Sequence, residues 1–127
     1  MLTDTKAFSG FAVDDIDAAK RFYGETLGLE VKVLDEQHGL ITIKTAAGEE
    51  IFVYAKPDHS PANFTLLNFE VDDIDVAVAG LAERGVAFER YDGFDHDEKG
   101  IARGPGPQIA WFKDPAGNTL SVLQPPG

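Results

Sequence analysis

The sequence contains no cysteine. This absence excludes a disulfide framework, a thiol nucleophile and a thiolate metal site. No apolar run approaches the ~18 residues of a membrane-spanning helix, and the opening residues, MLTDTKAF, lack the apolar core of a signal peptide. These absences predict a cytoplasmic protein with no membrane partner.

Basic residues are scarce, with 11 Lys and Arg against 22 Asp and Glu, a net charge of −11 and a pI near 4.5. Such a surface repels phosphate backbones, which argues against nucleic acid as a partner, and it would favour a cationic ligand. Its simplest consequence is solubility. The length of 127 residues and the 43% hydrophobic content suit one domain with one core. A half of about 60 residues would bury too little surface to be stable alone.

One phrase occurs twice in the chain: residues 11–17 read FAVDDID and residues 69–75 read FEVDDID. Six of the seven positions are identical at a separation of 58 residues, and a fixed internal period of this length indicates a repeated structural module. Each copy passes from a strand-like alternation through an Asp pair into a helix-like pattern that ends in glycine, at Gly28 and Gly85. We therefore expect a single domain, 1–127, with a first module at 1–56, a linker at 57–63 and a second module at 64–124.

The patterns predict one helix and four strands in each module. Asp14 or Asp15 should cap the first helix, and Asp72 or Asp73 the second. Alternating or apolar runs bounded by turn residues predict strands at 6–13, 30–34, 40–45 and 50–55, and then at 65–71, 87–91, 109–113 and 119–123. The fold class expected is α+β.

This layout, with the two VDDID phrases, LGL at 27–29 and DPAGNTLSVLQ at 114–124, resembles the vicinal oxygen chelate superfamily. That superfamily includes glyoxalase I, extradiol dioxygenases, fosfomycin-resistance transferases and bleomycin-resistance proteins. The likeness spans nearly the whole chain. It implies two tandem βαβββ modules whose mixed sheets curve into a cup.

The resemblance also implies where a metal would be held, because enzymes of the superfamily place four His, Glu or Gln ligands on the concave wall. Counting from the matching motifs assigns these places to Phe8, Phe52, Leu66 and Ser121. Three of them are hydrocarbons, and a neutral hydroxyl is a poor ligand beside carboxylate or imidazole. A slip of one residue would only move the side chains to the opposite face. We therefore expect no metal and no other cofactor.

The wall of the expected cup combines aromatic and aliphatic side chains with a few polar groups, as small-molecule sites do. The alternative is that these large residues fill the cup as a second core. Glu70 argues against filling, because a carboxylate is seldom buried without a partner. The predicted ligand-binding residues are Phe8, Phe52, Tyr54, Leu66, Asn68, Glu70, Ile109, Trp111 and Ser121, with Gly10 and Leu123 on the same wall.

The segment 92–108, DGFDHDEKGIARGPGPQ, is long for a connection between neighbouring strands. Such loops are usually either functional lids or disordered. Asp95 and Asp97 flank His96 and would favour its protonated form. Successive residues of DHDE point apart in an extended chain and cannot all reach one ion, so we expect a solvated charged loop.

Three functions remain open at this point. Metal-free bleomycin-resistance proteins are nearest in character, which suggests a metal-independent small-molecule binding protein that sequesters a cationic aromatic compound or antibiotic. The main alternative is a lyase, isomerase or dioxygenase of the same superfamily, with Glu70, Tyr54 or His96 as acid–base groups if it is metal-free. A filled, structural or partner-binding relative is the third. Exposed sheet edges tend to pair, so we also expect a homodimer.

Overall fold

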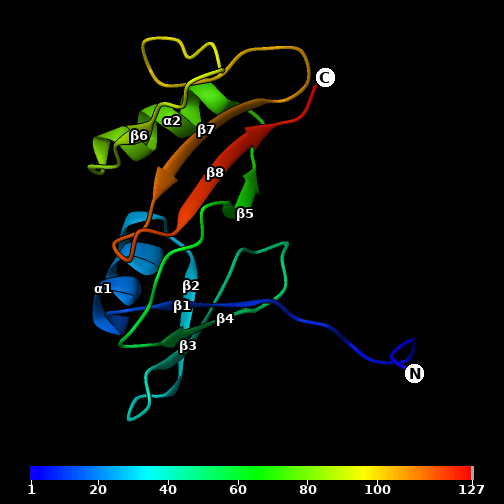
Figure 1. Ribbon diagram of the computed structural model, residues 1–127, viewed down its shortest axis with the longest axis vertical. Coiled ribbons are helices and arrows are strands. Elements are labelled where there is room, and N and C mark those ends of the chain that lie inside the picture. The colour runs from blue at the N-terminus through cyan, green and yellow to red at the C-terminus, as the bar shows by residue number, and fades with distance from the viewer. Residues whose placement is uncertain (127) are drawn as a thin grey trace. The chain divides into compact units, whose positions relative to one another are not determined.

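The computed structural model describes residues 1–126, and the chain divides into two compact units, Met1–His59 and Ser60–Gly127. Each unit contains one four-stranded mixed sheet and one helical segment, coloured from blue to red along the chain in Figure 1. The two units repeat the same order of elements, as the doubled phrase predicts. The expectation that they form a single domain stays a prediction.

The two sheets have the same topology. The first has the order β1 (Gly10–Val13), β4 (Ile51–Ala55), β3 (Leu40–Lys44), β2 (Glu30–Asp35), and the second has β5 (Thr65–Glu70), β8 (Thr119–Gln124), β7 (Gln108–Lys113), β6 (Phe88–Glu89). In each, the first strand is parallel to its neighbour and the other pairs are antiparallel. The predicted α+β fold of two tandem βαβββ modules is confirmed.

The second Asp of each DD pair caps the helix that follows. Asp15 Oδ1 accepts the backbone N–H groups of the first turn of α1 (Ile16–Lys20), at 3.0 and 3.1 Å. Asp73 Oδ1 does the same for α2 (Ile74–Glu83), at 3.1 and 3.3 Å. These bonds satisfy donors that have no partner within the helix, so the repeated phrase fixes the start of both helices.

The first helix continues as a π-helix, η1 (Arg21–Thr26), which the sequence patterns did not predict. Its wider turn is closed by a bond of 2.9 Å from the Leu27 N–H to the Phe22 carbonyl, five residues earlier. The sequence left open whether Phe22 or Tyr23 joins the core. The structure buries Tyr23 fully and leaves Phe22 half-buried. The two rings form a T-shaped pair with centroids 5.2 Å apart.

Each sheet buries one face beside the helix of its own unit. The hydrophobic side chains buried on this face alternate along the strands: Phe11, Val13, Ile41, Ile43 and Val53 in the first unit, and Ala110, Phe112, Leu120 and Val122 in the second. On the opposite face, Thr42, Trp111 and Ser121 are buried as well. Residues of the opposite alternation lie on what we call the helix-free face of each sheet. This face carries the predicted site residues.

Two predicted strands are shorter than expected. β1 begins at Gly10 rather than at Lys6. Its bonding to β4 starts just before Gly10, where the Phe52 N–H donates to the Ser9 carbonyl at 3.0 Å. β6 covers only Phe88–Glu89, since at Arg90 the chain turns away and its guanidinium binds the carbonyls of the following loop. Within residues 1–126, no helix is both long and apolar enough to cross a membrane.

Candidate functional site

The helix-free face of the first sheet carries an aromatic platform, formed by Phe8, Phe52 and Tyr54. The rings of Phe8 and Phe52 lie 4.5 Å apart between centroids and are tilted by 35°. Phe8 is 63% exposed and Tyr54 44% exposed, so the platform faces solvent. Gly10 is the parallel partner of Phe52, and a Cβ at Gly10 would come within 3.3 Å of the Phe52 carbonyl oxygen. A glycine here keeps the β1 side of the platform free of a side chain.

A shallow depression of about 150 Å³ lies on the same face of the first sheet. It is lined by Glu30, Lys32, Thr42, Lys44 and Glu50. The sequence-based prediction did not include it, because the wall residues predicted for the first module, Phe8, Gly10, Phe52 and Tyr54, all lie on or beside β1 and β4. The alternation of EVKVLD in β2 and LITIK in β3, which places charged residues on the face opposite the buried Ile residues, is the signal that could have found it.

In the second unit, the polar pair Asn68 and Ser121 marks the helix-free face. The two residues are Cα partners in β5 and β8, and the Ser121 hydroxyl donates to the Asn68 amide oxygen at 2.6 Å. Ser121 is fully buried whereas Asn68 is exposed. A buried hydroxyl therefore orients the exposed amide. Trp111 is the next partner of Ser121 across the sheet, in β7.

Glu70 lies one row further along the same face. Its partner in β8 is Leu123, which in turn pairs with Ile109 in β7. Glu70 is exposed, and none of the ion pairs formed within residues 1–126 includes it. Its carboxylate is therefore open to a cation from solution.

The four places that correspond to metal ligands in the superfamily do not fit a divalent ion. Phe8 and Phe52 stack on each other, Ser121 is buried against Asn68, and Leu66 occupies the irregularity in the β5–β8 register. In the described part of the chain, no three His, Asp or Glu side chains are grouped so that they could hold a metal. The donor set that such an ion needs is absent from these positions.

Trp111 is only 9% exposed, because rings from the preceding loop pack around it. The centroids of Tyr91, Phe94 and His96 lie 5.3, 5.1 and 5.9 Å from that of Trp111, all at steep angles. Tyr91 and Phe94 were not predicted to join the site, and His96 was considered only as an acid–base group of the enzyme alternative. Tyr91 directly precedes the loop at 92–108, and Phe94 and His96 lie within it, so their spacing gave only a weak signal.

His96 has a role other than the one expected. Its Nε2 accepts the Tyr91 backbone N–H at 3.1 Å and its Nδ1 donates to the Gly100 carbonyl at 2.8 Å. An imidazole that accepts on one nitrogen and donates from the other is neutral. The expectation of a solvated, protonated histidine was therefore wrong: half-buried His96 holds the loop together, because backbone groups occupy both nitrogens.

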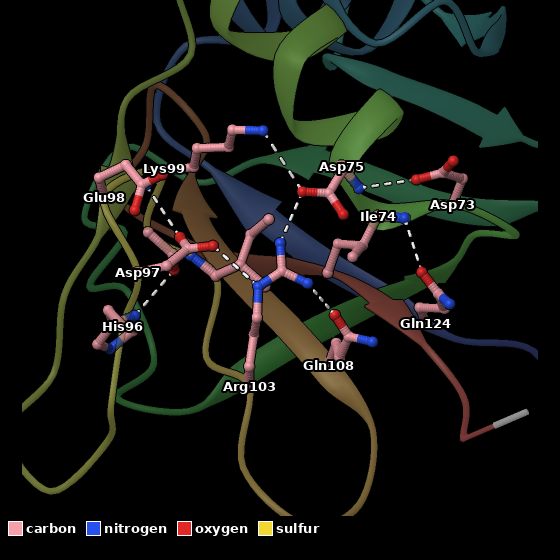
Figure 2. A network of polar contacts seen from close by, with 12 residues as sticks. Asp73, Ile74, Asp75, His96, Asp97, Glu98, Lys99, Arg103, Gln108 and Gln124 are labelled. Atoms are coloured by element: carbon pink, nitrogen blue, oxygen red, sulfur yellow. Dashed lines mark hydrogen bonds and ion pairs between the residues drawn. The ribbon is translucent and has the colours of Figure 1, made fainter.

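Arg103 fastens this loop to the start of α2, as Figure 2 shows. Its Nη2 donates to Asp75 Oδ1 at 2.6 Å, its Nε donates to Asp97 Oδ2 at 2.9 Å, and Nη1 donates to the Gln108 side chain. The hydrogen bond from Arg103 lowers the pKa of Asp75. Desolvation raises the pKa of Asp97, but hydrogen bonds from the Ile101 backbone and from Arg103 outweigh it, so that pKa also lies below its usual value. The loop is thus ordered by charge-assisted bonds.

The predicted site residues fall into two groups, one in each unit. Phe8, Phe52 and Tyr54 come together in the first, and Leu66, Asn68, Glu70, Ile109, Trp111 and Ser121 share the β5–β8–β7 part of the second sheet.

The chain matches the Glyoxalase/Bleomycin resistance protein/Dioxygenase superfamily over residues 7–122. Since this match covers nearly the whole chain, the protein belongs to that superfamily.

Solved structures agree with this assignment. The chain is similar to TnmS3, an antibiotic binding protein from Streptomyces sp. CB03234, with 28% identity, a TM-score of 0.72 and coverage of 98% of this chain and 99% of that one. A glyoxalase/bleomycin resistance protein from the same organism also has 28% identity, with a TM-score of 0.64 and coverage of 93% and 100%. Lactoylglutathione lyase from Agrobacterium tumefaciens, at 21% identity, a TM-score of 0.69 and coverage of 98% and 96%, shares the fold alone. No curated protein matches the sequence.

Proposed function

We propose that this chain is a metal-independent small-molecule binding protein that sequesters a cationic aromatic compound, such as an antibiotic. The observation that carries the proposal is the chemistry at the superfamily's ligand positions, where Phe8 stacks on Phe52 and Ser121 binds Asn68. Similarity to an antibiotic binding protein supports it. The fold alone would not, because one fold hosts both binding proteins and enzymes.

Each unit carries a feature that favours an aromatic cation: the aromatic platform in the first and Glu70 in the second. Exposed aromatic rings offer stacking and cation–π contacts to a planar cation. Glu70 adds an unpaired negative charge, and the net charge of −11 raises the local concentration of cations. A planar molecule that carries a positive charge therefore suits these groups better than one that carries only a negative charge.

The test compares a planar aromatic cation, ethidium, with a planar aromatic anion, 8-anilinonaphthalene-1-sulfonate, by calorimetric titration. We expect the cation to bind more tightly, and Glu70→Gln to weaken its binding by about ten- to a hundredfold, the effect of one charge-assisted hydrogen bond. Glu83→Gln, at the exposed end of α2, is the matched control and should leave binding unchanged. Stronger binding of the anion, or a cation preference that survives Glu70→Gln, would contradict the proposal.

The same titration separates binding from catalysis. A sequestering protein returns its ligand unchanged, whereas a lyase, isomerase or dioxygenase converts it. We expect intact ethidium after prolonged incubation and release by denaturation, as measured by mass spectrometry. A product formed with the protein but not with buffer alone would instead support an enzyme.

A further inference from the structure

The depression on the first sheet is lined by two positive and two negative side chains around Thr42. Glu30 and Lys44 are direct Cα partners across β2 and β3, a position where opposite charges usually pair. Nevertheless, none of the ion pairs within residues 1–126 includes Glu30, Lys32, Lys44 or Glu50. All four charges are therefore available to groups from solution.

The depression lies next to the aromatic platform in the register of the sheet. Thr42 is the Cα partner of Phe52 on one side and of Lys32 on the other, so one row across the sheet leads from an aromatic ring to an ammonium group. Thr42 itself is only 2% exposed. A ligand would therefore meet the charged side chains around the threonine rather than its hydroxyl.

We propose that this depression binds the zwitterionic head group of an aromatic compound, an ammonium and a carboxylate on neighbouring atoms, while the ring rests on Phe8, Phe52 and Tyr54. The inference rests on the proposed function, because both need the aromatic platform. The carboxylate is bound by Lys32 and Lys44, and the ammonium by Glu30 and Glu50. Two charges of each sign favour a head group that carries both.

The size of the depression suits the head group of a ligand rather than a whole aromatic ligand. Its volume of about 150 Å³ lies below the ~300–1,000 Å³ of pockets that enclose a drug-sized ligand. It has room for a small polar head group, whereas the ring remains on the exposed platform.

The test uses three forms of one aromatic scaffold with the full chain: 2-naphthylalanine, which is zwitterionic, its cationic methyl ester, and its anionic N-acetyl derivative. Binding is followed by changes in backbone amide NMR shifts. We expect the zwitterion to bind at least about threefold more tightly than either relative, as one partly exposed ion pair would give. The largest shifts should fall on Thr42 and Phe52.

Charge-neutralising variants assign the contacts. The double variant Lys32→Gln and Lys44→Gln should reduce binding of the zwitterion to the level of the methyl ester, and Glu30→Gln with Glu50→Gln should reduce it to the level of the N-acetyl form. Lys113→Gln is the matched control, because Lys113 lies on β7 in the second unit and is already paired with Glu89 at 3.7 Å. Circular dichroism checks that each variant is folded.

The outcomes separate this inference from the proposed function. If the zwitterion bound no more tightly than the methyl ester, with the N-acetyl form weakest and the shifts still centred on Phe52, the zwitterion site would be overturned and the proposed binding of aromatic cations would remain intact. Shifts confined to residues 60–126 would also overturn the zwitterion site. Failure of all three forms and of ethidium to bind would overturn both proposals.

Discussion

The hydroxyl of Ser121 lies 2.6 Å from the side-chain oxygen of Asn68, and this bond joins a fully buried residue to an exposed one. It occupies the place where the superfamily resemblance puts a metal ligand. In the first unit, the corresponding place holds the Phe52 ring, stacked on Phe8. These two places thus hold a hydrogen bond in one module and a ring pair in the other.

Removal of the Ser121 hydroxyl should destabilise the protein. Ser121→Ala loses one part-buried hydrogen bond, so we expect the free energy of unfolding to fall by ~1 kcal/mol in urea denaturation. In a double-mutant cycle with Asn68→Ala, the coupling should be about 0.5–1.5 kcal/mol. Ser60→Ala, on an exposed residue, serves as the control. Strict additivity of the two substitutions would show that the bond contributes nothing to stability.

A second prediction concerns metal content. After exhaustive dialysis, elemental analysis should find no stoichiometric divalent ion, because Phe8, Phe52, Leu66 and Ser121 offer no suitable donors. EDTA should also leave the melting temperature unchanged, since a metal that binds the folded state would raise it. About one Zn, Ni, Fe or Mn per chain, lost on substitution of residues at these positions, would refute metal independence.

Local sequence signals predicted much of the fold. The caps at Asp15 and Asp73 depend on residues two or three positions away, and the phrase that holds them is repeated. The ordered loop could not be predicted in this way, because the Arg103–Asp75 bond joins residues 28 positions apart. The π-helix was missed for another reason: its residues have the same apolar spacing as an ordinary helix.

The candidate site was predictable only in part. Alternation along each strand identified which side chains share a face, so the grouping of Phe8 with Phe52 followed from spacing and resemblance. The packing of Tyr91 and Phe94 on Trp111 depends on how a long loop folds back. The charged depression depends on β2 and β3 pairing in register. The loop packing has no periodic signal within one segment, and the alternation within β2 and within β3 shows only which charged residues share a face.

A third prediction tests the role of His96. At neutral pH, ¹⁵N NMR of the imidazole should show a proton on Nδ1 and none on Nε2, because Nε2 accepts the Tyr91 N–H. His96→Ala should break both bonds and speed hydrogen exchange at Tyr91 by at least several-fold. His38, exposed in the first unit, is the control residue. A proton on Nε2 would contradict this arrangement.

A fourth prediction is that the protein forms a homodimer. β2 lies at one edge of the first sheet, and its Val33 and Leu34 side chains are 45% and 42% exposed. Exposed apolar edges tend to pair with another copy. Sedimentation at low micromolar concentration should give about twice the mass of one chain. Val33→Lys with Leu34→Lys should shift the population toward monomer, and a wild-type species of 13.7 kDa would refute the prediction.

The last prediction concerns pH and the bonds made by Arg103. Asp75 and Asp97 have folded-state pKa values lowered below 3.8. A lowered carboxyl pKa stabilises the folded state fully above the unfolded pKa, and this contribution is lost as the pH falls through the folded value. Acidification below about pH 3.8 should therefore release the loop from α2. The fluorescence of Trp111, the sole tryptophan, should shift to the red as loop rings such as that of Phe94 move away from it.

Substitution of the arginine should produce part of this change at neutral pH. Arg103→Gln removes the donors to Asp75 and Asp97, so we expect a red shift at pH 7 and a smaller further shift on acidification. Arg21→Gln, on the exposed surface of η1, should behave like the wild type. Because these groups are partly exposed, 0.5 M salt should weaken the effect of Arg103. If Arg103→Gln and the wild type had identical spectra from pH 7 to pH 3, Arg103 would not be what orders the loop over Trp111.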